Sequence, residues 1–583
     1  MKSTVHPPSF FNRLRTSRIR LSLALLAVLL LAVGGWLYSR RVPHVALETY
    51  VPESALGYLE VNNLPRLLDS LTATTAWQQL APAYGLSDKL RYLGKVGTLA
   101  RVTGIGNQEA LLLARAQFAV VITGIEVRGE EVKPRLAVIA ETHGSADKLR
   151  AIIESRLPQL AERVYGQPIK EATEYAGVPV TIYKAASGER RLLSAQLGGE
   201  WIIANHPDPL RACLDTRQGR TPSMANNFYL RNARPAVDHD SEMFAFVSGM
   251  GVVRFLQFGA HLVSGGMISS TPYASALQDL LAEISSRASD GLAYGASFEG
   301  GEVADRYALL FKPEIMDRLR ATITVNQGEL RALNLVPPSV KEVTLINIED
   351  PSRALDGVEA AISSQMQTGQ SFLLHRFILG AREAFFGLKA GESAAPAIGS
   401  EIASLGFTEE VTDRILLVAV RDRTLLTRLT ERFLSQRGAS LKRETYSGVE
   451  ITSSSDARRG AAAFVGDFLA LGARAQILRL IDARQRGEAL ANTPQFAAAV
   501  KPSQSAAILS FSSVKDETGA MLASLARWLQ GSRVPASSAP ALDQLPLAAS
   551  AMSLSEGGIY IESHAPFGNF PFFVSLAGDA IRE

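Results

Sequence analysis

Residues 51–69 read VPESALGYLEVNNLPRLLD, and residues 336–356 read VPPSVKEVTLINIEDPSRALD. Both stretches open with Val-Pro, place a serine two residues after the proline, and carry an asparagine at position 62 or 347. With two residues inserted in the second stretch, they also share an arginine, a leucine and an aspartate. Each alternates apolar and polar residues before a further proline, which predicts a short strand followed by the start of a helix.

The similarity continues in the same order over more than 200 residues. The further matches are RLAVIA at 135–140 with RILLVA at 414–419, Tyr175, Gly177 and Val178 with Tyr446, Gly448 and Val449, GGEWIIA at 198–204 with VGDFLAL at 465–471, LRACLDTRQG at 210–219 with ILRLIDARQRG at 477–487, SEMFAFVS at 241–248 with SQSAAILS at 503–510, and Glu299-Gly300-Gly301 with Glu556-Gly557-Gly558. So many matches in one order indicate an internal duplication. We therefore expect two homologous units at 44–315 and 336–570, a linker at 316–335 and a tail at 571–583.

Local patterns predict the fold class of each unit. Strand patterns fall at 58–62, 118–125, 136–140, 178–183, 192–197, 201–204, 243–248, 292–298 and 303–311. Gly198-Gly199 separates two of these runs as a hairpin turn. Helices are expected at 66–71, at 146–160, and after Asp208 as N-cap with Pro209 in the first position. Strand pairs mixed with helices predict an α+β fold with largely antiparallel sheets.

Residues 21–38, LSLALLAVLLLAVGGWLY, form an 18-residue stretch without a charge. As a helix this stretch is about 27 Å long, close to the ~30 Å hydrocarbon core of a bilayer. Five basic residues precede it and two follow it, so the positive-inside rule places residues 1–20 in the cytoplasm. The alternative is a cleavable signal peptide, but Trp-Leu-Tyr-Ser-Arg-Arg after the apolar run is a poor cleavage site. We expect a single-pass signal anchor in the inner membrane, with the bulk of the chain periplasmic or extracellular.

Composition limits the class of partner. The chain has 583 residues, 47% of them hydrophobic, which is enough for two to four globular domains. All seven basic residues of 1–41 lie around the anchor, so the remaining 53 basic and 57 acidic residues give 42–583 a net charge of −4. A mildly acidic domain argues against nucleic-acid binding. Cys213 is the only cysteine, and its helical spacing with Leu210 and Leu214 predicts a buried side chain without a disulfide.

The Val-Pro-x-Ser-Ala-Leu-Gly-Tyr-Leu-Glu-Val-Asn-Asn opening at 51–63, the anchor and the duplication together resemble a family of bacterial membrane-anchored extracytoplasmic proteins. That family is known only as a domain of unknown function. The resemblance implies location outside the cytoplasm, and it implies no catalytic residues.

Short motifs suggest chemistry only weakly. Ser145 with Lys148, and Ser512 with Lys515, fit the Ser-x-x-Lys spacing of some acyl-transfer enzymes, but Ser145 also stands where a helix N-cap belongs. Asp238-His239-Asp240 is the most ligand-like cluster, yet adjacent side chains diverge and seldom reach one ion. Gly104-Ile105-Gly106 lacks the third glycine of a dinucleotide loop.

One charged motif is repeated. Asp215-Thr216-Arg217-Gln218 recurs as Asp482-Ala483-Arg484-Gln485. It is interpreted as a helix C-terminus with an intrahelical or tertiary ion pair, and the alternative is a paired functional site. No catalytic, cofactor-binding or metal-binding residue is assigned.

The expected function is therefore binding rather than catalysis. We expect an envelope binding or scaffold module with a cleft between the two units. Apolar stretches at 255–262, 277–284, 372–386 and 521–529 motivate an alternative, a carrier of lipid or another apolar ligand with a cavity larger than ~300 Å³. A hydrolase with an unrecognised active site is the second alternative.

Overall fold

The computed structural model describes residues 44–86, 89–103, 107–128, 131–187, 189–238, 241–254, 287–364, 392–408, 413–499, 506–530 and 539–571. The predicted anchor at 21–38 lies outside these residues. Within them, no helix combines the length and the apolar character that crossing a bilayer requires.

Twenty strands form one sheet in which every described pairing is antiparallel. The first half contains β1 Gly57–Val61, β2 Gln117–Arg128, β3 Glu131–Glu141, β4 Ile169–Tyr175, β5 Val178–Lys184, β6 Arg191–Leu197, β7 Glu200–Ala204, β8 Met243–Ser248, β9 Ser289–Glu299 and β10 Glu302–Phe311. The second half contains β11 Glu342–Asn347, β12 Ile398–Gly406, β13 Arg414–Val420, β14 Leu441–Tyr446, β15 Val449–Ser454, β16 Ala461–Val465, β17 Phe468–Gly472, β18 Ile508–Ser512, β19 Ala548–Leu554 and β20 Gly558–Ala565. The predicted α+β class with a largely antiparallel sheet is confirmed.

The strands of the two halves pair in the same order. In the first half the order across the sheet is β4-β5-β6-β7-β3-β2-β1-β8-β9-β10. In the second half it is β14-β15-β16-β17-β13-β12-β11-β18-β19-β20. Each strand of one half thus has a counterpart at the same position in the other.

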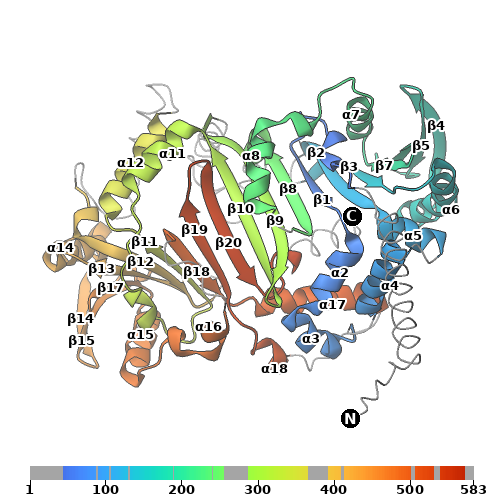
Figure 1. Cartoon of the computed structure of the whole chain (residues 1–583). Helices are drawn as coiled ribbons and strands as arrows, with labels where there is room; N and C mark the ends of the chain where they lie inside the picture. Colours follow the sequence, from blue (N-terminus) through green and yellow to red (C-terminus); the bar gives the residue numbers. More distant parts are fainter. Residues whose placement is uncertain are drawn as a thin grey trace, which may run out of the picture.

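The last strands of the two halves, β10 and β20, pair with each other in the middle of the molecule (Figure 1). Their register runs from Val303 opposite Ala565 to Leu310 opposite Gly558. Counted from the two Glu-Gly-Gly turns, Ala304 matches Ile561 and Tyr307 matches His564, and these residues pair crosswise. The central pairing is therefore its own image under a two-fold rotation that exchanges the halves.

The helices lie on both faces of this sheet. The α-helices are α2 Leu64–Ala73, α3 Thr75–Leu80, α4 Lys89–Thr103, α5 Gln108–Arg115, α6 Ala146–Tyr165, α7 Pro207–Arg217, α8 Phe228–Val237, α11 Pro313–Thr322, α12 Pro351–Ser363, α14 Arg423–Leu434, α15 Arg474–Arg486, α16 Pro494–Ala498, α17 Lys515–Gln530 and α18 Ala539–Leu542. Short 3-10 helices include η1 Leu47–Thr49, η3 Met224–Asn226, η4 Arg331–Asn334 and η9 Leu490–Asn492.

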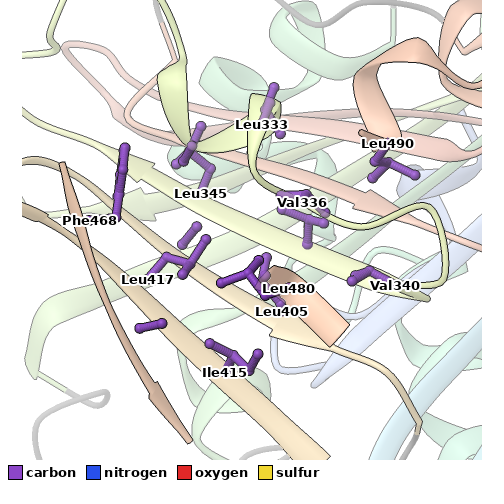
Figure 2. Close-up of a cluster of buried hydrophobic side chains, with 14 of the residues drawn as sticks. Leu333, Val336, Val340, Leu345, Leu405, Ile415, Leu417, Phe468, Leu480 and Leu490 are labelled. Carbon is purple, nitrogen blue, oxygen red and sulfur yellow. The ribbon is translucent and has the colours of Figure 1, made fainter. Parts of the chain in front are cut away.

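Each half has a core on the same face of the sheet. In the second half, α15, η4 and η9 cover this face, and Figure 2 shows Leu345, Leu405 and Leu417 of the sheet beside Leu480 of α15. In the first half, α7, α8 and η1 cover the equivalent face over Tyr58 and its neighbours. Strand alternation sends Leu59 and Val61 to the opposite face.

Helix α17 of the second half packs in the core of the first half. Its Met521, Leu522 and Ala526 share one buried cluster with Leu67 of α2 and Trp77 of α3. Figure 1 shows α17 running below α2, away from the strands β18 and β19 that flank it in sequence. The two halves are therefore joined by a strand pairing and also by helix α17 of the second half, which packs in the first half.

Most of the predicted elements are present, with two local corrections. Asn63 caps α2, and the hairpin turn at Gly198 joins β6 to β7 as expected. Helix α7 starts two residues earlier than predicted, because extended His206 is the N-cap and Pro207 takes the first position. Ser145 precedes α6, but its hydroxyl makes no capping hydrogen bond.

Residues 316–335, the predicted linker between the two units, are packed against the rest of the fold. They contain most of α11, whose Ile315, Met316 and Leu319 are buried with Ala361 of α12. They also contain η4, where the backbone N–H of Ala332 donates to Glu401. The segment is packed because it supplies apolar residues that complete the second half.

Candidate functional site

A surface pocket of about 570 Å³ opens in the first half between residues 52–54, helix α7 and residues 221–222. Its lining residues are Pro52, Glu53, Ser54, Asp208, Arg211, Ala212, Asp215, Thr221 and Pro222. Two backbone hydrogen bonds connect residues 51–54 to residues 221–224. Glu53 N donates to Pro222 O at 3.0 Å, and Met224 N donates to Val51 O at 2.7 Å. The two loops that line the pocket are therefore bonded to each other.

A second pocket, of about 200 Å³, opens at the equivalent place in the second half. Its lining residues are Pro337, Pro338, Ser339, Arg479, Asp482, Ala483, Arg486 and Glu488, from the second Val-Pro loop, α15 and the turn after it. Leu490 N donates to Val336 O at 2.7 Å, as Met224 N does to Val51 O. We call these pockets site one and site two.

Both sites are bordered by a tyrosine at the tip of a hairpin. Tyr175 ends β4 and donates its hydroxyl to Asp215 at 2.9 and 3.1 Å. Tyr446 ends β14 and donates to Asp482 at 2.8 Å. These bonds raise the pKa of each tyrosine, because the phenolate form would face a carboxylate.

The geometry of each hairpin turn sets the direction of its tyrosine. Ala176 and Gly177 have φ angles of 54° and 78°, and Ser447 and Gly448 have 51° and 80°. Two consecutive positive φ angles in a two-residue turn are typical of the type I′ turn, which suits the twist of paired strands. The Ala-Gly and Ser-Gly dipeptides therefore bring Tyr175 and Tyr446 to the same position over α7 and α15.

The repeated Asp-x-Arg-Gln motif holds these hairpins to their helices. Gln218 donates to Ala176 O and Gln485 donates to Ser447 O, each at 3.3 Å. Arg217 makes a tertiary ion pair with Glu200. The Nε–H of Arg217 donates to both carboxylate oxygens of Glu200, at 2.7 and 2.8 Å. Arg484 instead lies over the β16–β17 turn, close to Gly466. The motif thus acts as a clamp beside each site.

The two sites share a framework but differ in charge. At site one the guanidinium of Arg211 stacks on the Tyr175 ring at 5.3 Å, and Arg220 bonds Asp215 with its Nε at 2.9 Å. At site two Arg486 pairs with Glu488 at 3.0 Å, and exposed Arg479 lines the opening. Mixed charges around prolines suit a polar, extended ligand better than an acyl chain.

The Ser-x-x-Lys candidates do not form a site. Ser145 and Lys148 are both exposed, whereas a Ser–Lys pair needs an enclosed setting to activate its serine. Ser512 lies in β18, and Lys515 binds Asp543 at 2.9 Å.

The other candidate positions are only partly described. Asp238 accepts a bond from Arg234 at 3.1 Å, while His239 and Asp240 lie outside the described residues, as do Gly104 and Gly106. Across the described part of the chain, no group of His, Cys, Asp and Glu side chains is placed to hold a metal ion.

Cys213 and one of the apolar stretches are accounted for by packing. Cys213 is fully buried, as predicted, and burial raises the pKa of its thiol to about 12. Residues 521–529 belong to α17 and contribute to the shared core. The stretches at 255–262, 277–284 and 372–386 lie outside the described residues.

A polar cluster that the sequence analysis missed lies at one end of β1, β2 and β3. Buried Gln117 bonds both backbone groups of Val45, and it also contacts Asn62 at 2.7 Å and His143 Nε2 at 2.9 Å. No spacing signals this cluster, because Gln117 is 72 residues from Val45 and 55 from Asn62.

Comparison with known families found a match to part of the second half. Residues 398–577 match the model of a family described as a protein of unknown function, DUF3352, in agreement with the resemblance inferred from the sequence. No curated protein matches the chain. No solved structure matches it either.

Proposed function

We propose that this protein is a membrane-anchored binding or scaffold protein of the cell envelope, which presents two matched sites on one rigid sheet. The observation that carries the proposal is that site one and site two are built from the same loop, helix and Tyr–Asp bond in both halves. When a binding surface is duplicated and its two copies bind different parts of a partner, the copies keep a common framework and acquire different charges.

The proposal includes the duplication itself and the anchor. The identical strand order supports descent of 44–315 and 336–570 from one ancestral unit. Residues 21–38 would be an uncleaved signal anchor, with residues 1–20 cytoplasmic and the sheet outside the inner membrane. The motivating observations are the 18 uncharged residues and the basic flanks. Alkaline extraction that releases the chain from membranes would remove this part of the proposal.

The ligand we favour is an extended polypeptide of an envelope partner. Charged and proline-lined rims bind backbone groups and mixed-charge side chains, whereas a carrier of apolar cargo needs an enclosed apolar cavity. Both sites are open at the surface and carry at least three ionisable lining residues each. The shared central sheet, rather than a cleft between the halves, would set the distance between the two sites.

Site-directed photocrosslinking in cells tests this function. A photoreactive residue at exposed Ser54 or Ser339 should crosslink to the same partner, and a probe at exposed Ala151 on α6 should not. Arg211→Glu and Arg479→Glu should each lower the crosslink yield on the order of tenfold, as an opposed charge at a rim can cost about 1.4 kcal/mol. Exposed Arg150→Glu on α6 is the matched control.

Two results would contradict the proposal. One is a set of crosslinks that Arg211→Glu and Arg479→Glu leave unchanged. The other is a lipid-sized adduct in native mass spectrometry of the gently purified chain, released on denaturation, which would favour an apolar-ligand carrier.

A further inference from the structure

Helix α4 exposes apolar side chains to solvent. Tyr92, Leu93, Val96 and Leu99 are 68%, 54%, 38% and 61% exposed. Their spacing places them on one broad side of the helix. Removing apolar side chains from water is favourable, so this face favours a less polar environment than water.

The opposite side of α4 is fixed to α2. A Cβ added at Gly94 would lie 2.5 Å from Asp69 Oδ1, and one at Gly97 would lie 3.0 Å from Pro65. Thr98 donates its hydroxyl to Asp69 Oδ2 at 2.6 Å. The two glycines allow close contact with α2, so the apolar side faces outward, and Figure 1 shows α4 on the outer side of α2.

The charges of α4 are all positive. Its sequence KLRYLGKVGTLARVT contains Lys89, Arg91, Lys95 and Arg101 and no acidic residue. Arg91 and Lys95 are exposed and make no ion pair with any described residue. This contrasts with the net charge of −4 of residues 42–583, so α4 is a local basic and apolar surface.

The position of α4 in the fold is also informative. Arg101 donates to Ala114 O at 2.9 Å and to Asn62 O at 3.5 Å, and Asn62 in turn contacts Gln117, which bonds Val45. Val45 follows Tyr38, the last residue of the proposed anchor, by seven residues. Seven extended residues reach at most about 25 Å. If residues 21–38 form the proposed anchor, the C-terminal end of α4 is held within reach of the point where the chain would leave the membrane.

We propose that α4 docks on the surface of an anionic lipid bilayer, with Arg91 and Lys95 at the headgroups and Tyr92, Leu93 and Val96 at their boundary with the acyl chains. Amphipathic basic helices bind membranes in this way. The inference rests on the proposed anchor for the membrane face that is used and for the nearness of α4 to it, whereas the basic and apolar surface of α4 is independent of the anchor. Charge argues against the other occupants, since residues 1–20 and a second α4 are themselves basic.

Lipid-dependent fluorescence quenching of the full chain in vesicles tests this docking. Leu93→Cys receives an environment-sensitive fluorophore, and Cys213 stays unlabelled because it is buried. Leu355→Cys on α12, 43% exposed in the second half, is the control. Vesicles contain a spin-labelled lipid and either phosphatidylcholine alone or a mixture with phosphatidylglycerol.

With phosphatidylglycerol we expect at least about twofold more quenching at position 93 than at 355, with the excess lost in Arg91→Glu/Lys95→Glu. Equal quenching at both positions would overturn the docking of α4, as would a disulfide between two copies of unlabelled Leu93→Cys after mild oxidation in the presence of vesicles. Flotation separates the two proposals. A chain that floats with both vesicle types but shows no quenching keeps the anchor and loses the docking. Flotation with phosphatidylglycerol alone supports the docking without the anchor, and no flotation at all removes both.

Discussion

Asp305 is a residue at which burial changes an acid–base equilibrium. It is buried in β10 and accepts a bond from the Tyr294 hydroxyl at 2.7 Å. Burial raises its pKa to about 6, although the bond from Tyr294 and the backbone N–H of Asn569 lower it. Desolvation of the carboxylate thus outweighs its two hydrogen bonds.

The folded protein should therefore lose stability as the pH rises through the titration of Asp305. The unfolded carboxyl titrates near 3.9, so between about pH 4 and pH 6 the folded state binds more protons than the unfolded state. Relative to Asp305→Asn, the free energy of unfolding of the wild type should fall by about 2–3 kcal/mol from pH 4 to pH 7. Urea unfolding at several pH values measures this difference. Asp356→Asn at an exposed position of α12 should follow the wild type, and parallel curves for all three proteins would contradict the argument.

Among the helices, α17 lies in the second half of the sequence but packs in the core of the first half. Leu522 is fully buried in the cluster that also contains residues of α2 and α3, Tyr84, Leu86 and sheet residues such as Met243. Neither α2 nor α3 buries its apolar side against the sheet alone, so α17 supplies the missing partner.

Leu522→Ala should lower the free energy of unfolding by about 2–5 kcal/mol, the usual loss when a buried leucine leaves a cavity. Hydrogen exchange should then accelerate in residues 64–80, more than 400 positions away in sequence. Leu480→Ala is the matched control, because Leu480 is equally buried but belongs to the core of the second half. If Leu522→Ala accelerated exchange only around α17 itself, the shared core would be disproved.

For the whole molecule, the pairing of β10 with β20 makes the halves one folding unit. Eight residue pairs join β10 to β20 at the central seam, and helix α17 adds buried apolar contact between the halves on one face. Separating the halves would expose the edges of two central strands, each of which would leave a row of unpaired backbone groups.

Thermal unfolding should consequently occur as one cooperative transition, in which the calorimetric enthalpy equals the van't Hoff enthalpy. Ile561→Pro at the seam should lower the free energy of unfolding by about 3 kcal/mol or more, since proline removes a ladder bond within a central strand. A conservative Ile561→Val at the same position is the control and should cost only about 1 kcal/mol. Two separate heat-absorption peaks in the wild type would show that the halves unfold independently.

Features that depend on short-range pattern could be predicted from the sequence alone. Alternation and turn residues placed β5, β6, β7 and β8 and the helix α2, and the repeated Val-Pro and Asp-x-Arg-Gln segments marked the equivalent positions that later border the two sites. Local errors, such as the start of α7 at Pro207, arose where two prolines competed for one helix start.

The way in which the repeats are joined, and the surfaces that they expose, depend on long-range packing and could not be predicted from local sequence. The bond from Tyr175 to Asp215 spans 40 residues, and the seam pairs Arg306 with Glu562, 256 residues away. Any two antiparallel edge strands form the same ladder of backbone hydrogen bonds. The local sequence of β10 and β20 therefore does not show whether these strands pair with each other or end two separate sheets. Amphipathic periodicity likewise predicts that α17 has a buried side, but the surface that buries it is chosen by complementary packing across the whole fold.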